Sequence, residues 1–159
     1  MRTGGSTQTA NISARIERTF KASPEKVFQA WTQSDVMSRW ICTGPVYVVS
    51  CSIDARVGGG YRIHMRDPRG EDHIVSGTYD EVVPNQRLVF SWSWITTPDR
   101  QSRVSVDLAA AAGGGCHLTL VHDRFYDGAA RDGHARHWAA TLDLFDDKIG
   151  ATLSQKVDQ

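Results

Sequence analysis

The sequence predicts an α+β domain in which helices cover one face of an antiparallel sheet. Between residues 46 and 124 several short runs alternate apolar and polar residues, and short turns separate them. Helical patterns stand only before and after this region, so no crossover helix makes the strands parallel. The length of 159 residues fits one domain. We expect a flexible N-terminal arm over 1–10 and a single domain over 11–155.

Composition excludes several classes of protein. Hydrophobic residues make up 40% of the chain, which is enough for a core. The formal net charge is zero, so the chain lacks the excess of positive charge that is typical of nucleic-acid-binding proteins. No apolar run approaches the roughly 20 residues that span a bilayer. The start "MRTGGSTQTA" is polar and lacks the apolar region of a secretory signal. Three cysteines without CxxC spacing favour a reducing cytoplasm over a disulfide framework.

The first elements are a strand and two short helices. Residues 11–22 alternate and predict a strand. Ser23 is placed as the N-cap of the next helix, with Pro24 at its first position. A second helix is expected to begin at a Ser-Asp cap, residues 34–35, and to end near Trp40. Both helices are short, so packing must stabilise them.

About six strands follow, and a long helix closes the domain. The runs "YRIHMRD" and "RLVFSWSW" alternate clearly, and "DPRG" at 67–70 is a turn. The closing helix is predicted over about 131–154. Its apolar residues recur with helical spacing on one face: Trp138, Thr141, Leu142, Phe145 and Ile149.

This order of elements resembles the START-like, or SRPBCC, superfamily. The resemblance rests on "ASPEKVFQAWT", "RVGGGYRIHM", "VSGTYDEVVPNQRLVFSW", "HLTLVHDRF" and "WAATLDLF". Within it the chain is similar to the branch of the activator of the 90-kDa heat-shock-protein ATPase (Aha-type). The resemblance implies a helix-grip fold: a curved antiparallel sheet of six to seven strands around the long C-terminal helix, often with a cavity between them. Members usually carry glycine before the tryptophan of that helix, whereas this chain has His137.

Two motifs that suggest chemistry have simpler interpretations. "VGGGY" at 57–61 lacks the Gly-Lys-Ser/Thr of a phosphate loop and any parallel βαβ unit, so it predicts a bulge or bend. Cys42, Cys51 and Cys116 have no local base beside them and are interpreted as inert. No cofactor is expected.

The histidines suggest two alternative interpretations, a metal site and a catalytic site. His134 and His137 are one helical turn apart, but the Glu and spacing of HExxH are missing. His122 and Asp123 are the nearest further ligands in chain order, and we expect no metal. His134 is expected to face solvent or, with His137, to flank the mouth of a cavity. His122 is a weak catalytic candidate, because a desolvated histidine can be tuned as an acid or base.

We expect the domain to bind an apolar small molecule between the sheet and the last helix. Aromatic walls with a few polar tips suit such a ligand. Access is expected between the N-terminal end of the long helix and the two short helices. The expected cavity residues are Ile63, Met65, Tyr79, Phe90, Trp92, Trp94, His122, Trp138, Leu142 and Phe145.

Two other functions stay open at this point. One is an enzyme of the cyclase, dehydratase or hydrolase type, with a polar pair in the cavity. The other is a co-chaperone module, as the name of the branch suggests. No nucleic acid and no membrane is expected as partner, and an exposed edge strand can pair in a homodimer.

Overall fold

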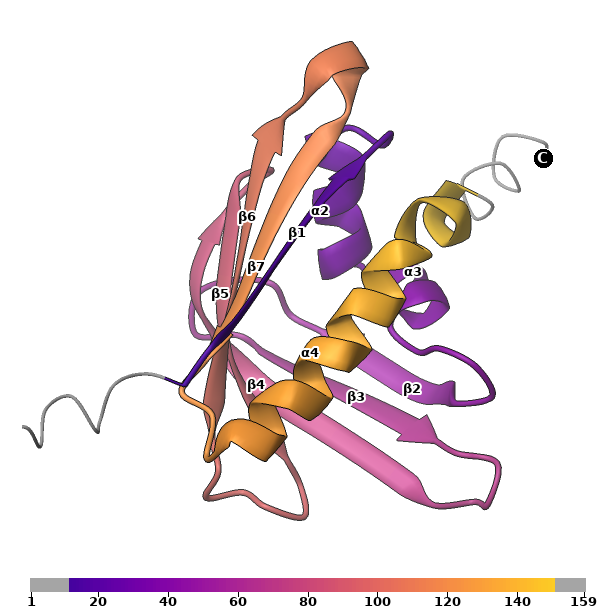
Figure 1. The fold of residues 1–159 in the computed structure, drawn as a ribbon, viewed down its shortest axis with the longest axis vertical. Helices are drawn as coiled ribbons and strands as arrows, with labels where there is room; N and C mark the ends of the chain where they lie inside the picture. Colours follow the sequence, from indigo (N-terminus) through magenta and orange to yellow (C-terminus); the bar gives the residue numbers. More distant parts are fainter. Residues whose placement is uncertain (1–11, 151–159) are drawn as a thin grey trace, which may run out of the picture.

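The computed structural model describes residues 12–150, and it shows one seven-stranded antiparallel sheet with helices packed on one face (Figure 1). The strand order is β1-β7-β6-β5-β4-β3-β2, so the first strand pairs with the last. The α+β helix-grip prediction is therefore confirmed. The strands are β1 (Ala14–Phe20), β2 (Tyr47–Ile53), β3 (Gly60–Arg66), β4 (Asp72–Val83), β5 (Arg87–Trp94), β6 (Ser102–Ala110) and β7 (Cys116–Asp123).

The sheet bends into two halves. In Figure 1, β1, β7, β6 and β5 run steeply, whereas β2, β3 and β4 cross the lower part of the view. Two register shifts, between Val48 and Ser50 and between Tyr79 and Glu81, mark bulges that let the strands turn. The "VGGGY" segment is also a bend: Gly58 has φ +84°, and a Cβ at Gly59 would collide with the Asp54 carbonyl oxygen.

Two short helices follow β1, as predicted. Helix α2 (Pro24–Thr32) begins after Ser23, whose hydroxyl accepts a hydrogen bond from the Lys26 N–H. Helix α3 (Ser34–Trp40) has Gln33 as its N-cap and no side-chain cap, so the predicted Ser-Asp cap is wrong by one residue. The segment between the helices is too short for Ser34 to stand outside the second one.

The closing helix, α4 (Gly128–Asp143), lies in the angle between the two halves of the sheet (Figure 1). It begins three residues earlier than predicted, because Asp127 caps it by accepting from the Ala130 N–H at 2.8 Å. Leu144 breaks it, and residues 145–150 are helical again. The last predicted residues, 151–154, and the predicted arm over 1–10 lie outside the described residues. Within residues 12–150, no helix is both long and apolar enough to cross a bilayer.

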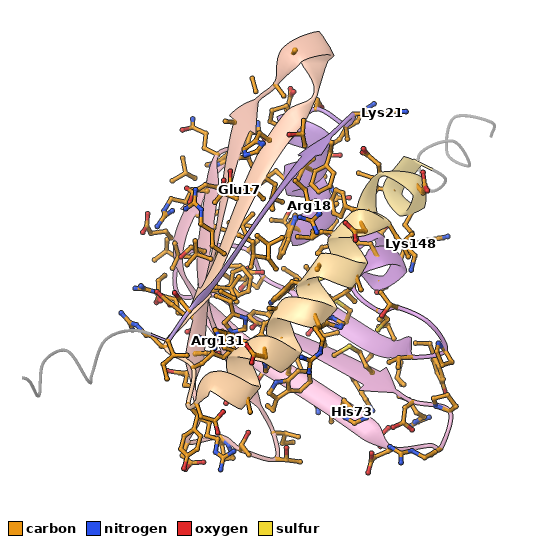
Figure 2. All side chains as sticks on the ribbon, viewed as in Figure 1. Glu17, Arg18, Lys21, His73, Arg131 and Lys148 are labelled. Carbon is orange, nitrogen blue, oxygen red and sulfur yellow. The ribbon has the colours of Figure 1, made fainter. Side chains whose placement is uncertain are left out.

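The core lies between α4 and the concave face of the sheet. The predicted inward residues are all buried, Trp138, Thr141 and Leu142 in α4 and Phe145 and Ile149 in the helical residues that follow it. At the end of α4, Arg18 Nε is 2.8 Å from Asp143 Oδ1, and beyond it Lys148 Nζ donates to the Cys42 carbonyl at 3.0 Å (Figure 2). These contacts fix one half of α4 against β1 and the end of α3, while its N-terminal half lies over β3, β4 and β5.

Candidate functional site

A pocket of about 420 Å³, which we call the outer pocket, opens beneath the N-terminal half of α4. Figure 2 shows His73 on β4, with the half of α4 that carries Arg131 crossing in front of the sheet. None of the described residues that line the pocket is Lys, Arg, Asp or Glu. The lining residues are Thr43, Val46, Met65, His73, Trp94, Ala129, Ala130, Gly133, His134 and His137.

Small residues on α4 create this space. Ala129, Ala130 and Gly133 fall on one face of the helix, where larger side chains would reach the sheet. A Cβ at Gly133 would meet nothing closer than Arg136 Nη2, at 3.9 Å. The cluster of small residues at the start of the helix is a signal that our sequence analysis missed.

His134 forms a wall of the pocket together with Trp94. Its Nδ1 lies 2.7 Å from the Ala130 carbonyl oxygen, so Nδ1 carries the proton and donates. Its Nε2 then accepts from the indole N–H of Trp94 at 3.0 Å. Burial lowers the pKa of His134. The prediction that His134 faces solvent is therefore wrong, because His134 lies four residues before the buried Trp138 and so on the sheet-facing side of the helix.

His137, the residue that replaces the usual glycine, also lines the pocket. Burial lowers its pKa, and a hydrogen bond to the backbone of Ile41 partly opposes this shift. His134 and His137, both with a lowered pKa, thus face a largely apolar space from successive turns of α4, and Thr43 and His73 are its other polar lining residues. As neutral imidazoles, His134 and His137 supply no charge near neutral pH.

His122 lies deeper and does not line the outer pocket. It is fully buried, and its Nδ1 accepts from the indole N–H of Trp138 at 3.0 Å. Its Nε2 therefore carries the proton and lies 2.7 Å from the Ser102 hydroxyl, which donates to the Trp92 carbonyl at 3.2 Å. Burial, and less strongly His134, lowers the pKa of His122 to about 2. With both nitrogens engaged, this imidazole has no free position for acid–base chemistry.

A second, closed space lies further inside, and we call it the inner chamber. It has about 10 Å³ of free volume between α2, α3, α4 and the sheet. Five of the predicted cavity residues line it: Ile63, Tyr79, Phe90, Trp92 and Trp138. Of the others, Met65 and Trp94 line the outer pocket, whereas His122, Leu142 and Phe145 are buried and line neither space. The predicted cavity residues are thus distributed over two separate spaces, because large aromatic rings fill the region between the sheet and the middle of α4.

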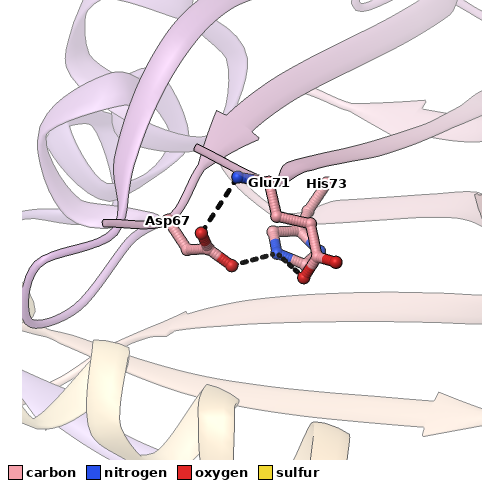
Figure 3. A group of neighbouring side chains, drawn as sticks. All are labelled: Asp67, Glu71 and His73. Atoms are coloured by element: carbon pink, nitrogen blue, oxygen red, sulfur yellow. Dashed lines mark hydrogen bonds and ion pairs between the residues drawn. The ribbon is translucent and has the colours of Figure 1, made fainter. Parts of the chain in front are cut away.

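One cluster of potential metal ligands lies at the β3–β4 turn. Asp67, Glu71 and His73 bring their ligand atoms within 4.8 Å of one another (Figure 3). Asp67 Oδ1 accepts from the backbone N–H of Arg69 and of Glu71, and His73 Nε2 lies 3.1 Å from Asp67 Oδ2. These bonds, with the His73 bond as the largest cause, lower the pKa of Asp67 to about 2.

This cluster is explained by the turn that it holds. Arg69 Nη2 forms ion pairs with both carboxylates, at 3.5 Å to Asp67 and 3.3 Å to Glu71, so one guanidinium offsets part of their charge. The Gly70 N–H donates to the Asp67 carbonyl at 2.9 Å and closes the predicted "DPRG" turn. The cluster therefore orients His73 at the rim of the outer pocket.

The three cysteines have no activated thiol. Burial raises the pKa of Cys42 to about 11 and raises the pKa of Cys51 and Cys116 above the usual range. All three are unpaired. A thiol with a raised pKa is a poor nucleophile at neutral pH, which agrees with the prediction that they are inert.

A known protein family matches most of the chain. The model of the family "Activator of Hsp90 ATPase homolog 1-like protein" matches residues 21–150, which include α2, α3, six of the seven strands and α4. The chain belongs to this family. The resemblance inferred from the sequence is thereby confirmed.

Several solved structures share the fold. A protein from Chromobacterium violaceum has a TM-score of 0.79 at 22% identity, over 86% of this chain and 96% of that one. The AHSA1 protein of Silicibacter pomeroyi has a TM-score of 0.75 at 24% identity, over 91% and 99%. An uncharacterised protein from Rhizobium leguminosarum has 27% identity and a TM-score of 0.72, over 89% and 95%. No curated protein matches the chain.

Proposed function

We propose that this protein binds an uncharged, largely apolar small molecule in the outer pocket. The observation that carries the proposal is a space of about 420 Å³ with apolar walls and neutral imidazoles. Ligand sites in proteins commonly have volumes of about 300–1,000 Å³ and are mostly apolar with a few polar groups. A charged ligand would lose its hydration there without meeting an opposite charge.

Trp94, His134 and His137 are the groups that give such a ligand its orientation. The Trp94 ring offers an apolar face and His137 offers a polar group, while the bonds of His134 to Ala130 and Trp94 hold the Trp94 ring in place. Met65 is flexible and can adapt to the shape of the occupant. We propose the cytoplasm as the compartment, since three unpaired cysteines fit reducing conditions.

Native mass spectrometry of freshly purified protein tests the proposal first. We expect an apolar compound of fixed mass that is released on denaturation. If none co-purifies, a panel of uncharged apolar compounds is titrated and followed by calorimetry. A clean mass together with no binding from the panel would refute the proposal.

A pair of variants on α4 makes the test specific to the pocket. Gly133→Leu places a side chain in the pocket and is expected to weaken binding at least about tenfold, since it occupies the volume that the ligand needs. Ala140→Leu adds the same group at an exposed position of the same helix and is expected to leave binding unchanged. Equal affinities of both variants would place the ligand elsewhere.

The name of the family raises activation of the Hsp90 ATPase as a second function. Its test is the ATPase rate of Hsp90 with and without this protein. A stimulation that Gly133→Leu does not alter would favour this alternative and separate it from pocket binding.

A further inference from the structure

The five tryptophans differ in what their indole N–H groups bind. Trp40 donates to the Ala30 carbonyl at 2.8 Å, and Trp94 and Trp138 donate to histidines at 3.0 Å each. Trp31 and Trp92 have no acceptor within hydrogen-bonding distance among residues 12–150, although they are only 1% and 3% exposed. Buried donors are nearly always paired, with protein or with ordered water, so these two groups need an explanation.

Both unpaired donors belong to residues that line the inner chamber. The ring of Trp138, which also lines the chamber, is 5.7 Å from the ring of Trp31 and 5.2 Å from that of Trp92. The free volume of about 10 Å³ is close to the smallest space that holds one water. The size of the chamber therefore matches a single oxygen atom, and two of its lining residues carry the unpaired donors.

The surroundings favour an oxygen without charge. None of the described residues that line the chamber is an acid or a base with a full charge. Burial raises the pKa of Tyr61 and Tyr79, both of which line the chamber, so the environment opposes negative charge. A carboxylate would be penalised in the same way.

We propose that the inner chamber is a binding site for one uncharged hydrogen-bond-accepting oxygen, held by the indole N–H groups of Trp31 and Trp92. In the free protein this oxygen belongs to a water. In the loaded protein it belongs to a carbonyl or hydroxyl group of the bound molecule, a source that rests on the proposed function.

The residues that line the inner chamber and the outer pocket support a bound molecule as a source of this oxygen. Ile63 and Met65 are successive inward residues of β3, and Trp92 and Trp94 hold the same relation on β5. In each pair the first lines the inner chamber and the second lines the outer pocket. A layer one side chain thick thus separates the spaces, and Met65 is its most adaptable member.

Indole NMR of the ¹⁵N-labelled protein tests the site without any ligand. The five indole signals are assigned with single Trp→Phe variants. We expect nuclear Overhauser contacts to a bound water from Trp31 and Trp92, and none from Trp40, whose acceptor is a carbonyl. The alternative is that both N–H groups point at aromatic rings. In that case the indole N–H protons of Trp31 and Trp92 would have upfield chemical shifts and show no contacts to water or ligand, and the proposal would be overturned.

Cyclohexanone and methylcyclohexane, which match in size, test the ligand as the source. We expect the ratio of their affinities to favour the ketone, and to fall about tenfold in Trp92→Phe, which keeps a ring but loses the donor. Trp40→Phe is the matched buried control and should keep the ratio. Binding of both probes with an unchanged ratio, and no water contact, would refute the oxygen site while leaving the outer pocket intact.

Discussion

At the scale of single residues, hydrogen bonds decide what each histidine can do. Strand parity correctly predicted that His122 points inwards, and it is buried. Parity carries no information on partners, so the indole and hydroxyl that engage both of its nitrogens could not be predicted from the sequence. His134 shows the converse case, since its spacing of four residues from Trp138 already places it on the buried side of the helix.

His122→Ala should strongly destabilise the domain. The change leaves the buried Trp138 N–H without an acceptor and creates a cavity, which together cost about 3 kcal/mol in free energy of unfolding. Urea unfolding measures this cost. His117→Ala is the control on the same strand, because His117 is 40% exposed and its removal should cost under about 1 kcal/mol. Similar losses for both variants would contradict a structural role for His122.

At the scale of elements, α4 combines a firmly held end with a sparsely packed one. Its buried residues repeat with helical spacing, so the element and its inward face were predictable. The first residue of the helix was not predictable, because the capping residue Asp127 lies four residues before residue 131, where the predicted helix begins. The small residues near its start leave the space that defines the outer pocket.

Gly133→Ala should stabilise the protein by about 0.5–1 kcal/mol, because alanine favours the helix and its Cβ has open space. Thermal unfolding of the free protein tests this. Gly77→Ala provides the contrast, since its Cβ would collide with the Ser91 carbonyl oxygen on the neighbouring strand. A gain at both positions would show that crowding at Gly77 is relieved.

Phe145→Ala should cost about 3–5 kcal/mol in free energy of unfolding, because it removes a fully buried ring from the core. The ring lies 4.5 Å from Phe20 and 5.0 Å from Trp40, so it joins β1 and α3 to the closing helix. Leu144→Ala changes the adjacent residue, which is 44% exposed, and should cost under about 1 kcal/mol. Denaturant titration compares the two.

At the scale of the whole molecule, the fold followed from the sequence more completely than the site did. The order of alternating strands and helices specifies the sheet and its grip on α4. Whether the space between the sheet and α4 is filled or empty depends on how the aromatic rings of five different elements pack against one another. Trp31, Trp92 and Trp138 close the centre, so the free volume moves towards the mouth beside Met65 and Trp94.

Three histidines, one buried and two half-buried, should make the stability of the whole domain sensitive to mild acid. The pKa of His122, His134 and His137 is lowered in the folded state, chiefly by burial. The unfolded chain therefore binds more protons below pH 6.5, and stability falls as pH falls. The loss is about 1.4 kcal/mol per pH unit for each histidine that stays neutral in the folded state.

Urea unfolding between pH 7 and pH 4.5 measures this slope, in a window above the range where Asp67 titrates. His137→Asn removes one of the three groups and should make the slope shallower. A free energy of unfolding that is constant over this window would show that the folded protein takes up these protons.

The unequal placement of the tryptophans also gives the domain an optical property. Four of the five indoles are buried, whereas Trp94 is only partly buried and lines the outer pocket. Emission from an indole shifts with the polarity of its surroundings, so solvent in the pocket should affect Trp94 most. An apolar occupant would replace that solvent and shift the red edge of the intrinsic fluorescence to shorter wavelength. Trp94→Phe should abolish this response, so the unmodified protein can report whether its own pocket is occupied.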